Sequence, residues 1–113
     1  MSSVPEISPL ELHHLLKNGP HPKLLDVREP EEHKLVKLRG SVLIPMMSIA
    51  DRLDEIRELS NNGAELVVVY CRSGKRSAIA IEWLASQGLT NLKNLRGGIN
   101  AYGNEADKRI TPY

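Results

Sequence analysis

The sequence predicts an α/β fold with a mainly parallel central sheet and helices on both of its faces. Short β-branched segments alternate along the chain with segments of helical periodicity, and strands that are joined by helices run parallel. Residues 66–70 are continuously apolar, which is typical of a strand buried on both faces. The 113 residues, 41% of them hydrophobic, are expected to form one domain, 1–113, with one core.

The first half of the chain predicts a capped helix followed by short strands. Ser8 is placed as the N-cap, Pro9 at the first helical position, and Glu11 where it closes a capping box. This helix is expected to end at Asn18-Gly19. Beyond it we expect strands at residues 23–27 and 42–44, with a helical turn at residues 30–34 between them.

The second half continues the alternation. A helix is expected from Met47 and Ser48 through Glu58, with its apolar residues on one face, and Trp83 is expected in the core because of its helical spacing. The remaining predicted elements are a turn at 61–63, a strand at 66–70, a helix at 77–87, a strand at 92–95 and a helical turn that ends at Tyr102.

Charge and cysteine content exclude several classes of function. The formal net charge of +1 provides no global field for nucleic acid or an anionic membrane, and no apolar run approaches the ~18 residues of a membrane span. One cysteine excludes an intramolecular disulfide, and residues 1–9 carry no signal-peptide pattern. We therefore expect a cytoplasmic protein in a reducing environment.

The chemistry is predicted where the buried strand 66–70 meets a cluster of cations. Cys71 follows that strand directly, and Arg72, Lys75 and Arg76 lie within five positions of it. Main-chain N–H groups at the start of a helix have no intrahelical partner, and together with nearby cations they stabilise a thiolate nucleophile. Gly74 permits a tight turn there. The alternative is a buried, inert cysteine.

Three motifs in order resemble the single-domain rhodaneses. They occupy residues 24–30, 68–77 and 94–102, and the loop and tail look most like the rhodanese domain of proteins that also carry an adenylyltransferase. Two departures stand out. The family usually has Gly-His-Ile-x-Gly-Ala where this chain has Val36-Lys37-Leu38-Arg39-Gly40-Ser41, and Tyr102 replaces a more usual Trp.

The resemblance implies a sulfurtransferase that needs no cofactor beyond a covalent persulfide on Cys71. Thiosulfate or a protein such as a cysteine desulfurase is the expected sulfur donor, and cyanide, a thiol or a sulfur-carrier protein is the expected acceptor. The expected sulfur- and substrate-binding groups are those of Arg72, Ser73, Gly74, Lys75, Arg76 and Ser77. Among these, Arg72 and Lys75 are candidates to bind the sulfonate end of thiosulfate. For Arg76, the alternative to substrate binding is that it braces the loop from within.

The resemblance also assigns Asp26 and Arg28 a supporting role beside the active loop. Their alternative is a solvated surface pair, and Glu29, Glu31 and Glu32 are expected to form a solvated acidic turn. The histidines are expected to be surface or packing residues, because their spacing relative to Cys71 does not suit a metal.

Two functions from other classes remain open. A cysteine-dependent phosphatase requires five residues between the cysteine and its arginine, and here only four separate Cys71 from Arg76. A rhodanese fold can also serve as a non-catalytic interaction module, although the presence of Cys71 argues against that role.

Overall fold

The computed structural model describes residues 4–113 and contains a five-stranded sheet in which all strand pairs are parallel. The strand order is β1-β5-β4-β2-β3, with β4 in the centre. The strands are β1 (Glu6–Ile7), β2 (Lys23–Asp26), β3 (Val42–Leu43), β4 (Val67–Tyr70) and β5 (Leu92–Leu95). The predicted α/β class with a parallel sheet is therefore confirmed.

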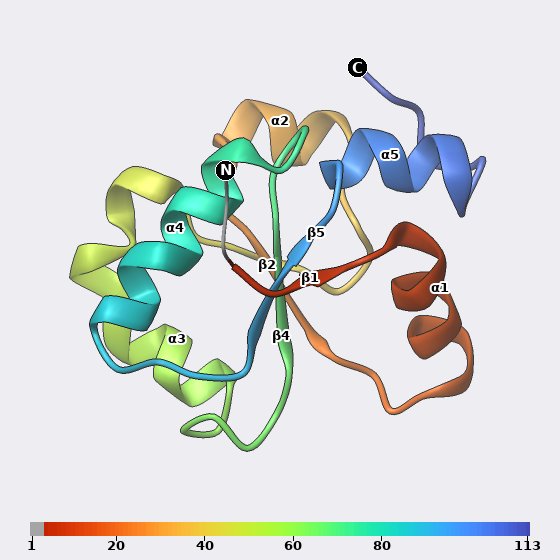
Figure 1. Ribbon diagram of the computed structural model, residues 1–113. Helices are drawn as coiled ribbons and strands as arrows, with labels where there is room; N and C mark the ends of the chain where they lie inside the picture. The colour runs from red at the N-terminus through yellow and green to blue at the C-terminus, as the bar shows by residue number, and fades with distance from the viewer. Residues whose placement is uncertain (1–3) are drawn as a thin grey trace.

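Helices cover both faces of this sheet (Figure 1). They are α1 (Pro9–Asn18), α2 (Pro30–Leu35), α3 (Leu53–Leu59), α4 (Lys75–Ser86) and α5 (Gly98–Glu105). Alternate residues of β4 separate two clusters of buried side chains. Val67 and Val69 pack with residues of α3 and α4, whereas Val68 and Tyr70 pack with residues of α1 and α5. No helix of residues 4–113 is long and apolar enough to cross a membrane.

The sheet register brings the carboxyl ends of β2, β4 and β5 together. Asp26 pairs with Tyr70, and Val69 pairs with Asn94. All four residues of β4 are buried, as the apolar run predicts. Because ligands of parallel sheets bind beyond the carboxyl ends of the strands, Cys71 lies where a site is expected.

Several local predictions are confirmed and others are wrong. Ser8 and Glu11 form the predicted capping box. The helix after β4 begins at Lys75 rather than Ser77. Its N-cap is Gly74 in a left-handed conformation, which agrees with the tight turn expected at that glycine. The segment predicted as one helix from Met47 begins with two 3₁₀ turns, Met46–Ser48 and Ala50–Arg52. Trp83 is 37% exposed and is not a core residue, because it lies on the outer side of α4.

Candidate active site

The sulfur of Cys71 is buried and receives several polar contacts. The main-chain N–H groups of Gly74 and Ser77 donate to Sγ at 3.1 and 3.4 Å, and the Ser77 hydroxyl lies 3.3 Å from it. Cys71 is 1% exposed and also packs against the apolar cluster of α3 and α4. Two N–H dipoles that converge on one buried sulfur favour a negative charge on that atom.

Asn94 on β5 holds the loop from the neighbouring strand. Its side-chain amide donates to the Gly74 carbonyl at 3.0 Å, and its oxygen accepts from the Ser77 hydroxyl at 2.5 Å. The single hydroxyl proton of Ser77 thus has two acceptors within reach, Asn94 and the Cys71 sulfur. By turning, this hydroxyl can accept a hydrogen bond from a thiol or donate one to a thiolate.

The N-terminus of α5 holds the other side of the loop. The N–H groups of Ile99 and Asn100 donate to the carbonyls of Cys71 and Arg72 at 2.9 and 3.2 Å. Gly98 makes this approach possible, since a Cβ atom at that position would lie 2.2 Å from the Arg72 carbonyl oxygen. The loop is therefore fixed by two elements besides its own helix.

Arg76 forms an ion pair with Glu32 and thereby links the loop to α2. Its guanidinium donates to both carboxylate oxygens of Glu32, at 2.7 and 3.0 Å. Chiefly because of these hydrogen bonds, the pKa of Glu32 is lowered to about 2. Arg76 thus has a bracing contact, but with α2 and not within the loop as the alternative expected. The prediction that Glu32 belongs to a solvated acidic turn is wrong.

Asp26 and Arg28 form a fully buried ion pair rather than the surface pair that was the alternative. The guanidinium donates to both oxygens of Asp26, at 2.9 and 2.8 Å, and to the Val36 carbonyl at 2.6 Å. Burial acts to raise the pKa of Asp26, but hydrogen bonds from Arg28 and His33 hold it below its ordinary value. The pair is thus buried with its charges hydrogen-bonded, and its role in supporting the loop stays a prediction.

Of the cations proposed to bind a sulfonate, Arg72 and Lys75 are both exposed. The Arg72 guanidinium lies over the ring of Tyr113, 4.9 Å from its centroid. Beside the loop lies a cavity of about 470 Å³, whose lining includes Ser73, Gly74 and Lys75. The carboxylates of Glu6 and Glu82 also line it, so an anion in this cavity would meet two acids as well as Lys75 and the start of α4.

Sequence reasoning predicted Cys71 and its loop but missed the residues that hold the loop in place. Asn94 could have been noticed as a polar residue between apolar ones in a short strand. No local signal marks Tyr113 or Glu32, since their partners lie 81 and 44 residues away.

Comparisons with known proteins agree with this geometry. The family model described as "Rhodanese-like domain" matches residues 8–105. The chain belongs to the rhodanese-like family. A sulfurtransferase of Allochromatium vinosum is 36% identical over 89 residues, which are 79% of this rhodanese-like chain and 78% of that protein. The probable adenylyltransferase/sulfurtransferase MoeZ of Mycobacterium tuberculosis is 32% identical over 107 residues.

These relatives differ in how much of their own length this chain covers. The rhodanese-like chain spans 26% of MoeZ, and it likewise spans less than a third of several other curated relatives. Among solved structures, a rhodanese-like domain protein from Staphylococcus aureus superposes with a TM-score of 0.78 and 29% identity. That match covers 96% of this chain and 98% of the other, so the whole architecture is shared.

Proposed function

We propose that this rhodanese-like protein is a sulfurtransferase that carries sulfane sulfur as a persulfide on Cys71. The observation that supports this most strongly is the pair of main-chain N–H groups, from Gly74 and Ser77, directed at Sγ. These donors belong to the backbone, so the stabilisation that they give to a negatively charged sulfur does not depend on a side-chain conformation. They are preorganised to stabilise a sulfur anion.

The first half-reaction loads the cysteine. The Cys71 thiolate attacks the sulfane sulfur of thiosulfate, a new S–S bond forms, and the original S–S bond breaks. Sulfite leaves with the bonding electron pair, so a persulfide anion and sulfite replace a thiolate and thiosulfate without an external oxidant. We assign the sulfonate end of thiosulfate to Lys75 and Arg72, which are the exposed cations of the loop.

The second half-reaction transfers the outer sulfur from the Cys71 persulfide to an acceptor. A nucleophile such as cyanide or a thiolate attacks the outer sulfur, and the Cys71 thiolate leaves. The outer sulfur is expected to meet the remaining loop amides, from Arg72 to Ser77, in the way that Sγ meets two of them in the free enzyme. No general base is required, because each attacking group is already an anion.

The natural donor and acceptor are proposed to be proteins or small thiols rather than thiosulfate alone. Relatives such as MoeZ are named as combined adenylyltransferases and sulfurtransferases, a combination that fits transfer to a sulfur-carrier protein. We expect the reaction in a reducing cytoplasm, where the one cysteine stays free.

Intact-mass analysis after incubation with thiosulfate tests the proposal. Wild-type protein should gain one sulfur atom, lose it on addition of cyanide, and release thiocyanate. Cys71→Ser should gain no sulfur and release no thiocyanate, whereas Ser86→Ala, at an exposed position of α4, should behave as wild type. A Cys71→Ser protein that turns over cyanide at the wild-type rate would contradict the mechanism. Hydrolysis of a phosphotyrosine analogue without persulfide formation would favour a phosphatase instead, and failure of both reactions would favour an interaction module.

A further inference from the structure

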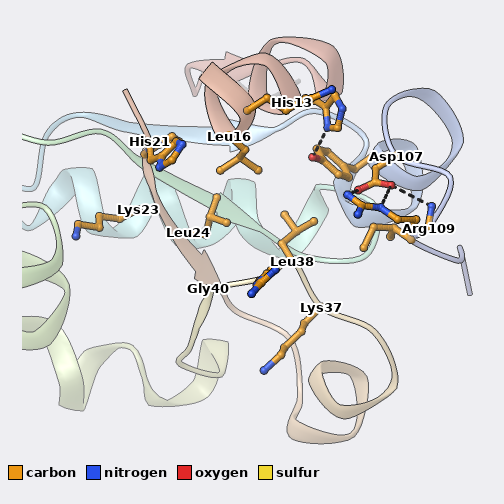
Figure 2. Close-up of a pocket in the computed structure, with 15 residues that line it drawn as sticks. His13, Leu16, His21, Lys23, Leu24, Lys37, Leu38, Gly40, Asp107 and Arg109 are labelled. Atoms are coloured by element: carbon orange, nitrogen blue, oxygen red, sulfur yellow. Dashed lines mark hydrogen bonds and ion pairs between the residues drawn. The ribbon is translucent and has the colours of Figure 1, made fainter. Parts of the chain in front are cut away.

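A second cavity, of about 740 Å³, lies on the face of the sheet that α1 and α5 cover. Apolar side chains of Leu16, Leu24 and Leu38 gather at its centre, as Figure 2 shows. Leu24 and Leu38 pack in the cluster of α1 and α5, whereas Cys71 packs in the cluster of α3 and α4. The sheet therefore separates this cavity from the cysteine. Its volume is in the range of small-molecule sites, about 300–1,000 Å³.

The rim of this cavity concentrates positive charge. Five of the 15 lysines and arginines of the chain line it, but only one of its 14 acids does, Asp107. Asp107 is already engaged by the Arg109 guanidinium, at 3.0 and 2.9 Å (Figure 2). Within the described part of the chain, Lys17, Lys37 and Arg39 form no ion pair with an acid. A protein with a net charge of +1 thus carries a strong local excess of positive charge here.

Two of these cations stand where the sequence departs from its family. Lys37 occupies the position of the usual His, and Arg39 follows two residues later. Both side chains are exposed and lie on either side of Leu38, which is 2% exposed and forms part of the cavity floor. The proposed transfer of sulfur at Cys71 gives these cations no role.

We propose that this cavity binds a small phosphate ester with an apolar body. Arg39 presents a planar fork of donors that matches phosphate oxygens, and Lys17 and Lys37 add point charges that suit a doubly negative group. The leucine floor would take the body of the ligand out of water, which favours binding in proportion to the apolar area buried. Neither a bare anion nor a neutral apolar molecule would use both parts of the cavity.

Titration of ¹⁵N-labelled protein with three probes tests this proposal. We choose 1-naphthyl phosphate, octyl phosphate and inorganic phosphate, which share the charged group and differ in the body. An ester should shift the amides of residues 37–40 and 107–110 and bind at least tenfold more tightly than inorganic phosphate. Preference for the naphthyl ester would indicate an aromatic body such as that of a nucleotide, and preference for the octyl ester an aliphatic one.

Charge reversal distinguishes this cavity from general surface charge. Arg39→Glu should weaken binding of the preferred ester at least tenfold. Lys93→Glu, an equal change at an exposed residue outside the cavity, should leave the affinity within twofold of wild type. The thermal midpoint of each variant verifies folding. Three results would overturn the proposal: equal affinity for inorganic phosphate, equal effects of the two reversals, or shifts confined to residues 71–77.

Discussion

The guanidinium of Arg72 lies over the ring of Tyr113, 4.9 Å from its centroid, although the two residues are 41 positions apart in the sequence. The hydroxyl of the same tyrosine accepts a hydrogen bond from Arg28 at 2.9 Å and donates one to Glu32 at 2.5 Å. One aromatic side chain therefore links an exposed cation of the loop to Arg28 and Glu32, each of which belongs to an ion pair. We therefore expect Tyr113 to position Arg72.

Removal of the Tyr113 ring should impair binding of thiosulfate. A cation–π contact at an exposed site contributes about 0.5–1 kcal/mol, so Tyr113→Ala should raise KM for thiosulfate roughly two- to fivefold. Tyr113→Phe keeps the ring and loses a hydroxyl that is hydrogen-bonded to two charged groups, so it should retain the wild-type KM and lower the free energy of unfolding by about 1.5–3 kcal/mol. Steady-state kinetics and urea unfolding measure the two effects. An equal rise in KM for both variants would show that the ring does not position Arg72.

Lys75 should serve the small-molecule donor rather than sulfur transfer itself. We expect Lys75→Ala to raise KM for thiosulfate, because an exposed cation beside the sulfonate is lost, and to leave transfer from a protein persulfide donor nearly unchanged. Lys34→Ala, at an exposed position of α2, is the matched control. Equal effects of Lys75→Ala on both donors would contradict sulfonate binding.

The hydroxyl of Ser77 should stabilise the sulfur anion. Ser77→Ala keeps the main-chain donor to Sγ and removes a hydrogen bond that, to a charged group, is worth about 1.5 kcal/mol or more. The rate of persulfide formation should fall roughly tenfold with little change in KM, as measured by single-turnover kinetics. Ser86→Ala, in the same helix, provides the comparison, and an unchanged rate in Ser77→Ala would exclude this role.

Gly98 should tolerate no side chain. Alanine at Gly98 combines a left-handed backbone with a Cβ atom 2.2 Å from the Arg72 carbonyl oxygen, and we expect a loss of roughly 3–5 kcal/mol of stability. Gly88 also has a positive φ, but a Cβ atom at that position would have no atom within 4 Å, so Gly88→Ala should cost only about 1–2 kcal/mol. Urea unfolding of both variants separates backbone strain from the clash. Equal losses would show that the loop and α5 are less closely packed.

Acid should weaken the brace between Glu32 and Arg76. The pKa of Glu32 is lowered to about 2, so its carboxylate stabilises the fold fully above pH ~4.5 and loses that contribution as the pH falls through about 2. Both side chains are partly exposed, which limits the contribution to about 1 kcal/mol. Wild type should exceed Glu32→Gln in stability by that amount at pH 7, and the difference should vanish near pH 2. Because Asp26 is present in both proteins, the difference isolates Glu32, and a difference independent of pH would contradict the assignment.

The sequence by itself determined the features that depend on neighbours along the chain. The apolar run 66–70 predicts the central strand, and Ser8 and Glu11 predict a helix start, because burial of a strand and capping of a helix are local patterns. The placement of Cys71 between a strand and a helix follows from the same kind of pattern. The cations that follow Cys71 within five positions can likewise be read directly from the sequence.

Only the tertiary structure decided where the loop side chains point. Arg76 turns to Glu32, Arg72 to Tyr113, and Asn94 to the loop, and each of these partners is brought near by sheet register and helix packing over separations of 17 to 44 residues. The cations of the second cavity likewise converge from segments that are distant in sequence. A side chain's direction depends on which surfaces the fold places around it, and no local pattern of the chain records those surfaces.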